Sequence, residues 1–142
     1  MVTVPPIPDA EEVLSALGEW PSFHDAEVIH FSLSRGAKPQ DNKSEAQLEI
    51  QVRQYQTRNA GTAEFGLVLI KNVLIRFAFT DVQQLEVEDF NHQNVIDSLE
   101  FIRESEATDS RIRVELTSIY GFGATWFCSD ARVVGVTNLL TK

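Results

Sequence analysis

The stretch Trp20-Pro21-Ser22-Phe23-His24-Asp25-Ala26-Glu27-Val28 decides how this chain is expected to fold. It stands between a short segment with helical spacing of apolar residues and a long region in which apolar and polar residues alternate. Proline ends helices because it has no amide hydrogen and restricts the residue before it. The stretch therefore predicts the corner at which a helix gives way to a sheet. Its two aromatic rings, histidine and carboxylates make it either a structural corner or the edge of a binding site.

Upstream of the corner, the sequence predicts an extended arm followed by one short helix. The prolines in Val4–Pro8 exclude a helix, so residues 1–8 are expected to form an extended N-terminal arm. Asp9 is a suitable N-cap for a helix over Ala10–Leu17, and Gly18 is a suitable residue to end it. The helix has one apolar stripe, which we expect to pack on the sheet.

Downstream of the corner, apolar and polar residues alternate, as in half-buried antiparallel strands. Leu48, Ile50 and Val52 give the clearest example. The same alternation marks the following further segments: Val28–Leu33, Val73–Phe79, Leu85–Val87, Ile112–Leu116 and one or two strands within Thr125–Val136. We predict an α+β, mainly β fold in a single domain over residues 1–142. It would contain an antiparallel sheet of about six or seven strands and one short N-terminal helix.

Residues 94–104 fit two structures. Helical spacing relates Val95, Ile96, Leu99 and Ile102, with Asn94 as N-cap, and would give a second helix near residues 94–104. Phe101 falls outside this stripe and fits a strand that pairs back onto Ile112–Leu116. We favour the strand.

The composition excludes several classes of protein. A lone cysteine, Cys128, cannot form an internal disulfide, and no apolar stretch approaches the about 20 residues that a membrane-spanning helix needs. The first residues lack the basic and apolar regions of a secretory signal. We therefore expect a cytoplasmic protein that does not bind membranes.

Acidic residues are concentrated in two segments. The formal net charge is -9 at pH 7, with -6 in residues 1–34 and -8 in residues 81–109. Nucleic-acid binders need Lys and Arg to neutralise phosphates, so no nucleic-acid partner is expected. A negative face would attract a basic protein instead. The alternative is that acidity only keeps the protein soluble.

No segment has the spacing of a catalytic, cofactor or metal motif. His24 and Asp25 are the groups of an acid–base pair, but neighbours on a strand face opposite sides. In a strand, His24 and His30 would lie about 20 Å apart, too far to share a metal ion. Cys128 alternates with Trp126, which indicates a buried thiol rather than a nucleophile. We expect a non-enzymatic protein with no catalytic residues, no cofactor and no metal site.

Phe90-Asn91-His92-Gln93-Asn94 is a second polar cluster. Asn and His favour turns and hydrogen bonds from side chain to backbone, so one interpretation is a capped turn. The other is a polar rim that presents amide groups to a ligand.

Several segments, in order along the chain, resemble the immunity protein 50 family of small bacterial proteins. They are Trp20–Val28, Leu85–Val87 leading into Phe90–Asn94, Ile119-Tyr120-Gly121, and Phe127-Cys128 shortly before Val133. The family is predicted to neutralise polymorphic toxins. The resemblance therefore implies a non-enzymatic binder that blocks a co-encoded toxin, and it leaves the toxin unnamed.

The leading hypothesis is a cytoplasmic binding protein whose acidic surface engages a protein partner, such as a basic toxin domain. The candidate partner-binding residues come from the corner, the acidic segment and the polar cluster: Trp20, His24, Asp25, Asp81, Glu86, Glu88, Asp89, Asn91 and His92. One alternative is a small-molecule-binding protein or unrecognised enzyme with a pocket of His24, Asp25 and His92. Another is a homo-oligomer in which an exposed strand edge pairs with a second copy.

Overall fold

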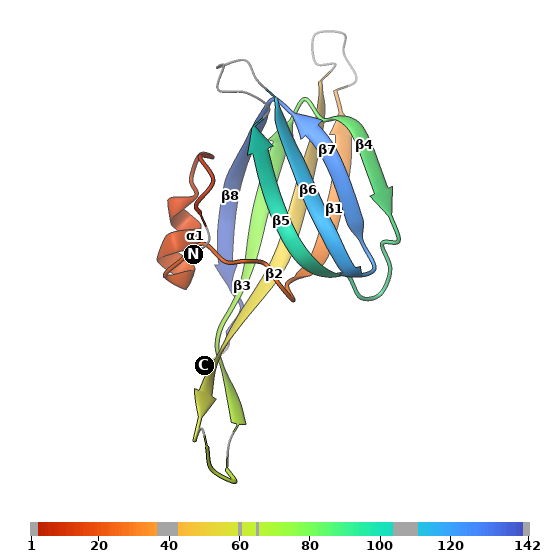
Figure 1. The fold of residues 1–142 in the computed structure, drawn as a ribbon. Coiled ribbons are helices and arrows are strands. Elements are labelled where there is room, and N and C mark those ends of the chain that lie inside the picture. The colour runs from red at the N-terminus through yellow and green to blue at the C-terminus, as the bar shows by residue number, and fades with distance from the viewer. Residues whose placement is uncertain (1–2, 37–42, 60, 65, 104–110, 141–142) are drawn as a thin grey trace.

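The computed structural model describes residues 3–36, 43–59, 61–64, 66–103 and 111–140. In these residues eight strands form one antiparallel sheet, in the order β4-β7-β6-β5-β1-β2-β3-β8, beside one short helix (Figure 1). The elements are α1 (Glu11–Leu17), β1 (Glu27–Arg35), β2 (Ser44–Arg58), β3 (Gly66–Thr80), β4 (Gln83–Glu88), β5 (Val95–Arg103), β6 (Ile112–Tyr120), β7 (Gly123–Cys128) and β8 (Asp130–Asn138). The predicted mainly β, antiparallel class is confirmed, and the sheet has more strands than the six or seven predicted.

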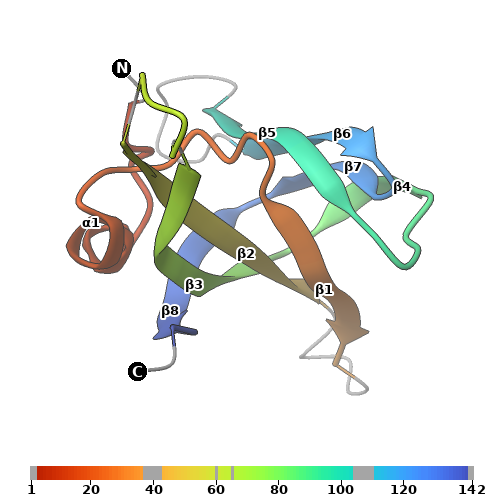
Figure 2. The same ribbon diagram turned by 90° about the horizontal axis from the view of Figure 1, so that it is seen from below.

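The sheet curves on itself, so that two four-stranded halves face each other (Figure 2). The halves are β4-β7-β6-β5 and β1-β2-β3-β8, and they are joined between β1 and β5 by the ladder pair Glu27 and Val95. Across the interior, the rings of Phe31 and Phe79 both contact Trp126, with centroids 5.4 and 5.0 Å apart. The core therefore lies between the halves and is rich in aromatic side chains.

The alternation along β2 places its apolar residues in this core, as predicted. Leu48 and Ile50 are fully buried and Val52 is nearly so, whereas Gln47 and Arg53 are exposed. Burying each such aliphatic side chain contributes roughly 1.5–3 kcal/mol. This period of two explains why the strands could be located from the sequence.

Residues 95–103 form β5, and the second helix considered for residues 94–104 is absent; residue 104 lies outside the described residues. The ladder register with β6 shifts between Ile96 and Ser98, which marks a β-bulge at Asp97. The extra residue in the bulge changes the spacing of the buried positions from two to three. Ile96 and Leu99 are therefore spaced as on the apolar side of a helix. The bulge is the physical reason for the ambiguity.

The N-terminal helix is present but begins one residue later than predicted. It covers Glu11–Leu17, and the prediction that Asp9 caps it is wrong, because Ala10 is the cap residue and no side chain caps the helix. Gly18 ends the helix in the left-handed conformation, with its amide donating to the Leu14 carbonyl, as expected. Within the described part of the chain, no helix is long and apolar enough to cross a membrane.

Beyond the body, β2 and β3 continue as a two-stranded projection (Figure 1). The ladder between β1 and β2 ends at Gln51, and the ladder between β3 and β8 ends at Val73. Among the described residues, 53–58 of β2 and 66–71 of β3 therefore have ladder partners only in each other's strand. We call this β2–β3 projection the arm; it is distinct from the N-terminal arm predicted for residues 1–8.

Candidate functional site

The corner Trp20–Val28 is a junction between the two halves of the sheet. The rings of Trp20 and Phe23 are buried, 5.7 Å apart, and Trp20 also contacts Phe77 of β3. The amide of Asp25 donates to the Ile96 carbonyl at 2.9 Å. Trp20 thus belongs to the core.

His24 and Asp25 lie on the outer side of this corner. The Nδ1 atom of His24 lies 2.9 Å from Oδ1 of Asp97, and its Nε2 atom lies 3.7 Å from Oδ1 of Asp25. All three side chains are more than half exposed, so water screens the pair. Asp97 could not be identified from the sequence, because only the bulge and the β1–β5 junction bring it to His24.

The pocket considered for His24, Asp25 and His92 is not assembled by hydrogen bonds. The ring of His92 packs on Tyr120, with centroids 6.2 Å apart, whereas His24 contacts Asp97. No group of three or more His, Cys, Asp or Glu side chains among the described residues is placed to hold a metal ion.

The segment Phe90–Asn94 is a turn held by its own side chains. Asn91 donates from Nδ2 to the Asp89 carbonyl at 2.9 Å and accepts at Oδ1 from the Gln93 amide at 3.0 Å. The segment is therefore a capped turn, the first of the two interpretations of its sequence. Asp89 and His92 remain exposed at its surface.

Asn94 connects this turn to both halves of the sheet. It is the one buried polar side chain among the described residues, with 3% exposed. Its Oδ1 accepts from the amides of Asn91 and Phe122 at 3.0 and 3.1 Å. Its Nδ2 donates to the carbonyls of Asn91 and Val28 at 2.9 and 3.5 Å. Every hydrogen-bonding direction of the amide is used, as burial of such a group requires.

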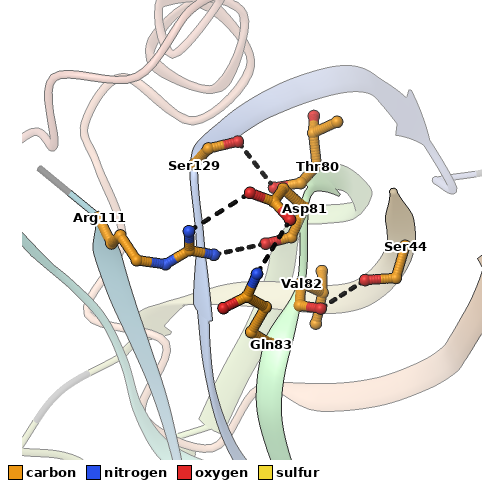
Figure 3. Close-up of polar contacts among 7 residues, drawn as sticks. All are labelled: Ser44, Thr80, Asp81, Val82, Gln83, Arg111 and Ser129. Atoms are coloured by element: carbon orange, nitrogen blue, oxygen red, sulfur yellow. Dashed lines mark hydrogen bonds and ion pairs between the residues drawn. The ribbon is translucent and has the colours of Figure 1, made fainter. Parts of the chain in front are cut away.

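Asp81 fastens the bend between β3 and β4, where the chain crosses from one half to the other (Figure 3). The guanidinium of Arg111 donates to its side-chain Oδ2 at 3.3 Å and to its carbonyl at 2.7 Å. The Asp81 amide donates to the Ser44 carbonyl at 2.7 Å, and Ser129 donates to the neighbouring Thr80 carbonyl. Of the acidic candidates, Asp81 is the one engaged in holding the fold.

Glu86 and Glu88 lie on the outer surface of the β4-β7-β6-β5 half. Glu86 is opposite Thr125, which is opposite Glu115 on β6, and Glu115 is opposite Glu100 on β5. Directly opposed residues share a face, so these carboxylates form a row across the strands. We call the outer surface that carries Glu86, Glu88, Glu100 and Glu115 the acidic face.

The acidic face contains an open hollow of about 520 Å³. Glu86, Glu88, Thr117 and Ser118 are among its lining residues, with Gly123 between them. A β-carbon at Gly123 would lie 3.4 Å from Oε1 of Glu88 and 3.4 Å from Cβ of Ser118, so glycine leaves room there. That Glu100 and Glu115 are neighbours of Glu86 could not be predicted from the sequence, because strand order decides which residues are neighbours.

The thiol of Cys128 lies in the core on β7 and is fully buried. Burial raises the pKa of this thiol to about 12. Almost no thiolate is present at neutral pH, and the thiolate is the nucleophilic form of cysteine. The buried thiol expected from the sequence is confirmed.

The comparison with known families decides what the chain is related to. The model of Imm50, described as immunity protein 50, matches residues 9–139. The chain belongs to the immunity protein 50 family. No curated protein and no solved structure matches the chain.

Membership of the immunity protein 50 family suggests an immunity protein, a class that is generally non-enzymatic and implies a protein partner. Three of the segments that carry the resemblance meet at Asn94. Val28 ends the corner motif, Asn91 belongs to the turn, and Gly121 leads into the amide of Phe122. The family-like segments therefore mark the fold, and the acidic face lies outside them apart from Glu86.

The packing of this immunity protein 50 fold around Asn94 predicts that Gly121→Ala is strongly destabilising. The backbone of Gly121 is left-handed (φ +85°), and an added β-carbon would collide with the Gln93 carbonyl and lie 2.7 Å from Oδ1 of Asn94. Gly61 is a matched control, because it has φ +80° and no atom within 4 Å of such a carbon. We expect Gly61→Ala to lower the free energy of unfolding by about 1 kcal/mol and Gly121→Ala by about 3 kcal/mol. Equal losses in urea unfolding would contradict the close packing of Gln93 and Asn94 against Gly121.

Asp81 and Glu86 should behave differently although both are acidic. Asp81→Ala removes the partner of the half-buried Arg111 and places alanine at φ 59°, so the free energy of unfolding should fall by roughly 1–3 kcal/mol. Glu86→Ala removes an exposed side chain and should change it by less than about 0.5 kcal/mol. Urea denaturation of both variants measures the difference. If Glu86→Ala were the more damaging change, the assignment of Asp81 to the fold would be wrong.

Cys128 should resist thiol reagents in the native protein. A pKa of about 12 in place of the ordinary 9.0 lowers the thiolate fraction at pH 8 by about a thousandfold, and burial blocks access as well. We expect reaction with Ellman's reagent to be slower by at least about this factor in buffer than in concentrated urea. Rapid labelling of folded protein would show that β7 opens or that the thiol is accessible.

Proposed function

We propose that this chain is an immunity protein that binds a co-encoded toxin domain of basic character through the acidic face, in the cytoplasm of the producing cell. The observation that carries the proposal is the row of Glu86, Glu115 and Glu100 across neighbouring strands. Family membership supports a protein partner, and the row of carboxylates is what favours this surface and a partner of basic character.

The row is unfavourable for folding, which is why it supports a role in binding. Glu115 and Glu100 are directly opposite each other on β6 and β5, and like charges in this position destabilise a sheet. Arg113 offsets part of the repulsion, with its guanidinium 2.9 Å from Oε1 of Glu115. A basic side chain of a partner would offset the remaining repulsion between these carboxylates.

The hollow gives the partner a place to insert such a side chain. Glu86 and Glu88 carry charge at the hollow, and Thr117, Ser118 and Thr125 carry hydroxyl groups. An Arg or Lys that enters would meet carboxylates and hydroxyl acceptors together. Arg suits this role best, because its planar guanidinium donates two parallel hydrogen bonds to one carboxylate.

Neutralisation needs no chemistry from this chain. A toxin whose own function depends on a basic surface is blocked when that surface is covered. Charge complementarity between the two proteins raises the association rate, which matters for a protein that must capture its toxin before the toxin acts. The acidic face would therefore act mainly on the rate of capture.

The test uses the toxin domain encoded beside this protein. The variant Glu86→Lys/Glu88→Lys should associate with it about tenfold more slowly or worse at low salt, and its rate should depend less on salt concentration. Stopped-flow fluorescence measures both rates, and survival of cells that co-express the toxin measures protection.

Glu11→Lys/Glu19→Lys is the matched control, because both residues are exposed, lie at or beside α1, and produce the same change in net charge. Its association rate should stay within about threefold of the unmodified protein. Equal slowing in both variants would mean that total charge, and not this face, attracts the toxin. Unchanged kinetics in the Glu86/Glu88 variant would refute the proposal.

A further inference from the structure

The arm exposes apolar side chains that the body does not cover. Leu67 is 62% exposed, Tyr55 53% and Ile70 40%. In both ribbon views the two strands of the arm leave the body together (Figures 1 and 2). After Gln51 in β2 and before Val73 in β3, the described ladder pairs join only these two strands to each other. Each strand therefore has an open edge in the arm.

An edge of this composition is unusual in a protein that acts alone. Leu67-Val68-Leu69-Ile70 is a continuous apolar run, a pattern typical of strands buried on both faces. Open apolar edges also promote unwanted pairing, and proteins normally protect them with charges, bulges or a covering element. By contrast β4, an edge of the sheet, carries Glu86 and Glu88. The arm is therefore built as a surface to be covered.

The charge of the arm indicates what covers it. The sequence from residue 53 to residue 71 contains Arg53, Arg58 and Lys71 but Glu64 as its one acid, for a net charge of +2. Since the whole chain has -9, the rest of it carries -11. A second copy of the chain therefore offers a surface of the opposite sign. A basic toxin would be repelled by the arm.

We propose that the arm of one copy docks on the acidic face of a second copy. The arm projects past the end of the body in Figure 1 and does not fold back over β4 and β7. It can therefore reach the acidic face only in another molecule. There, Arg58 and Lys71 pair with Glu86 and Glu88. Two copies that exchange arms reciprocally satisfy both arms and both faces, as a closed two-fold dimer requires.

The experiment is a charge exchange on the full-length protein, with no toxin present. Sedimentation velocity from about 1 to about 100 µM should show self-association that weakens at least tenfold as salt is raised. Arg58→Glu/Lys71→Glu and Glu86→Lys/Glu88→Lys should each be monomeric when alone. An equimolar mixture of the two should associate again, because each arm then meets a face of opposite sign. Glu11→Lys/Glu19→Lys should associate as the unmodified protein does.

Each other outcome overturns the proposal. A monomer throughout this concentration range would show that the arm has no affinity for a second copy. Association that survives both reversals and strengthens with salt would mean that arms pair with each other through their apolar edges. Recovery in the mixture also shows that both variants fold. The toxin is not in the experiment, so the result reports only the pairing of arm and face and not the proposed toxin binding, which uses the same face.

Discussion

The buried amide of Asn94 is the interaction on which the rest of the structure depends. It joins the turn at Asn91, the β1 carbonyl of Val28 and the amide of Phe122, which belong to separate parts of the chain. A buried amide is costly unless all its hydrogen bonds are made, so it tolerates one arrangement of these segments. Asn94 therefore fixes how the two halves of the sheet meet, where their ladder is only one pair wide. Glycine at position 121 follows from the same packing, since the Gln93 carbonyl and the Asn94 amide together occupy the space that a side chain would need.

The local part of this fold could be predicted from sequence, and the long-range part could not. Alternation located β2 and β6 because burial on one face imposes a period of two. The bulge at Asp97 interrupts that period, so β5 could be read as a helix. The corner at Trp20 was recognised, but the contact between His24 and Asp97 depends on which strands lie together. Strand order is set by the whole core, and a single sequence with regular alternation is compatible with many orders.

The candidate acidic residues differ in what they do, although their sequence context is similar. Asp81 is held by Arg111 at a bend, where its left-handed backbone and half-buried carboxylate serve the fold. Glu86 and Glu88 alternate along an edge strand whose other side packs on the core through Leu85. Charge density along the chain identified the segment, and only the ladder register identified the two further carboxylates, on β6 and β5, that complete the face.

The outward direction of the acidic side chains has a consequence for how such a protein diversifies. On β6 and β5 the residues next to them along each strand are buried or partly buried, and the Asn94 contacts lie among other segments. Substitutions at the outward positions therefore leave the core and the joint between the halves unchanged. Under the proposed function, exchange of these few residues would adapt the chain to a new toxin in small steps, each of which yields a folded protein. The outward residues and the architecture can thus change separately within one short chain.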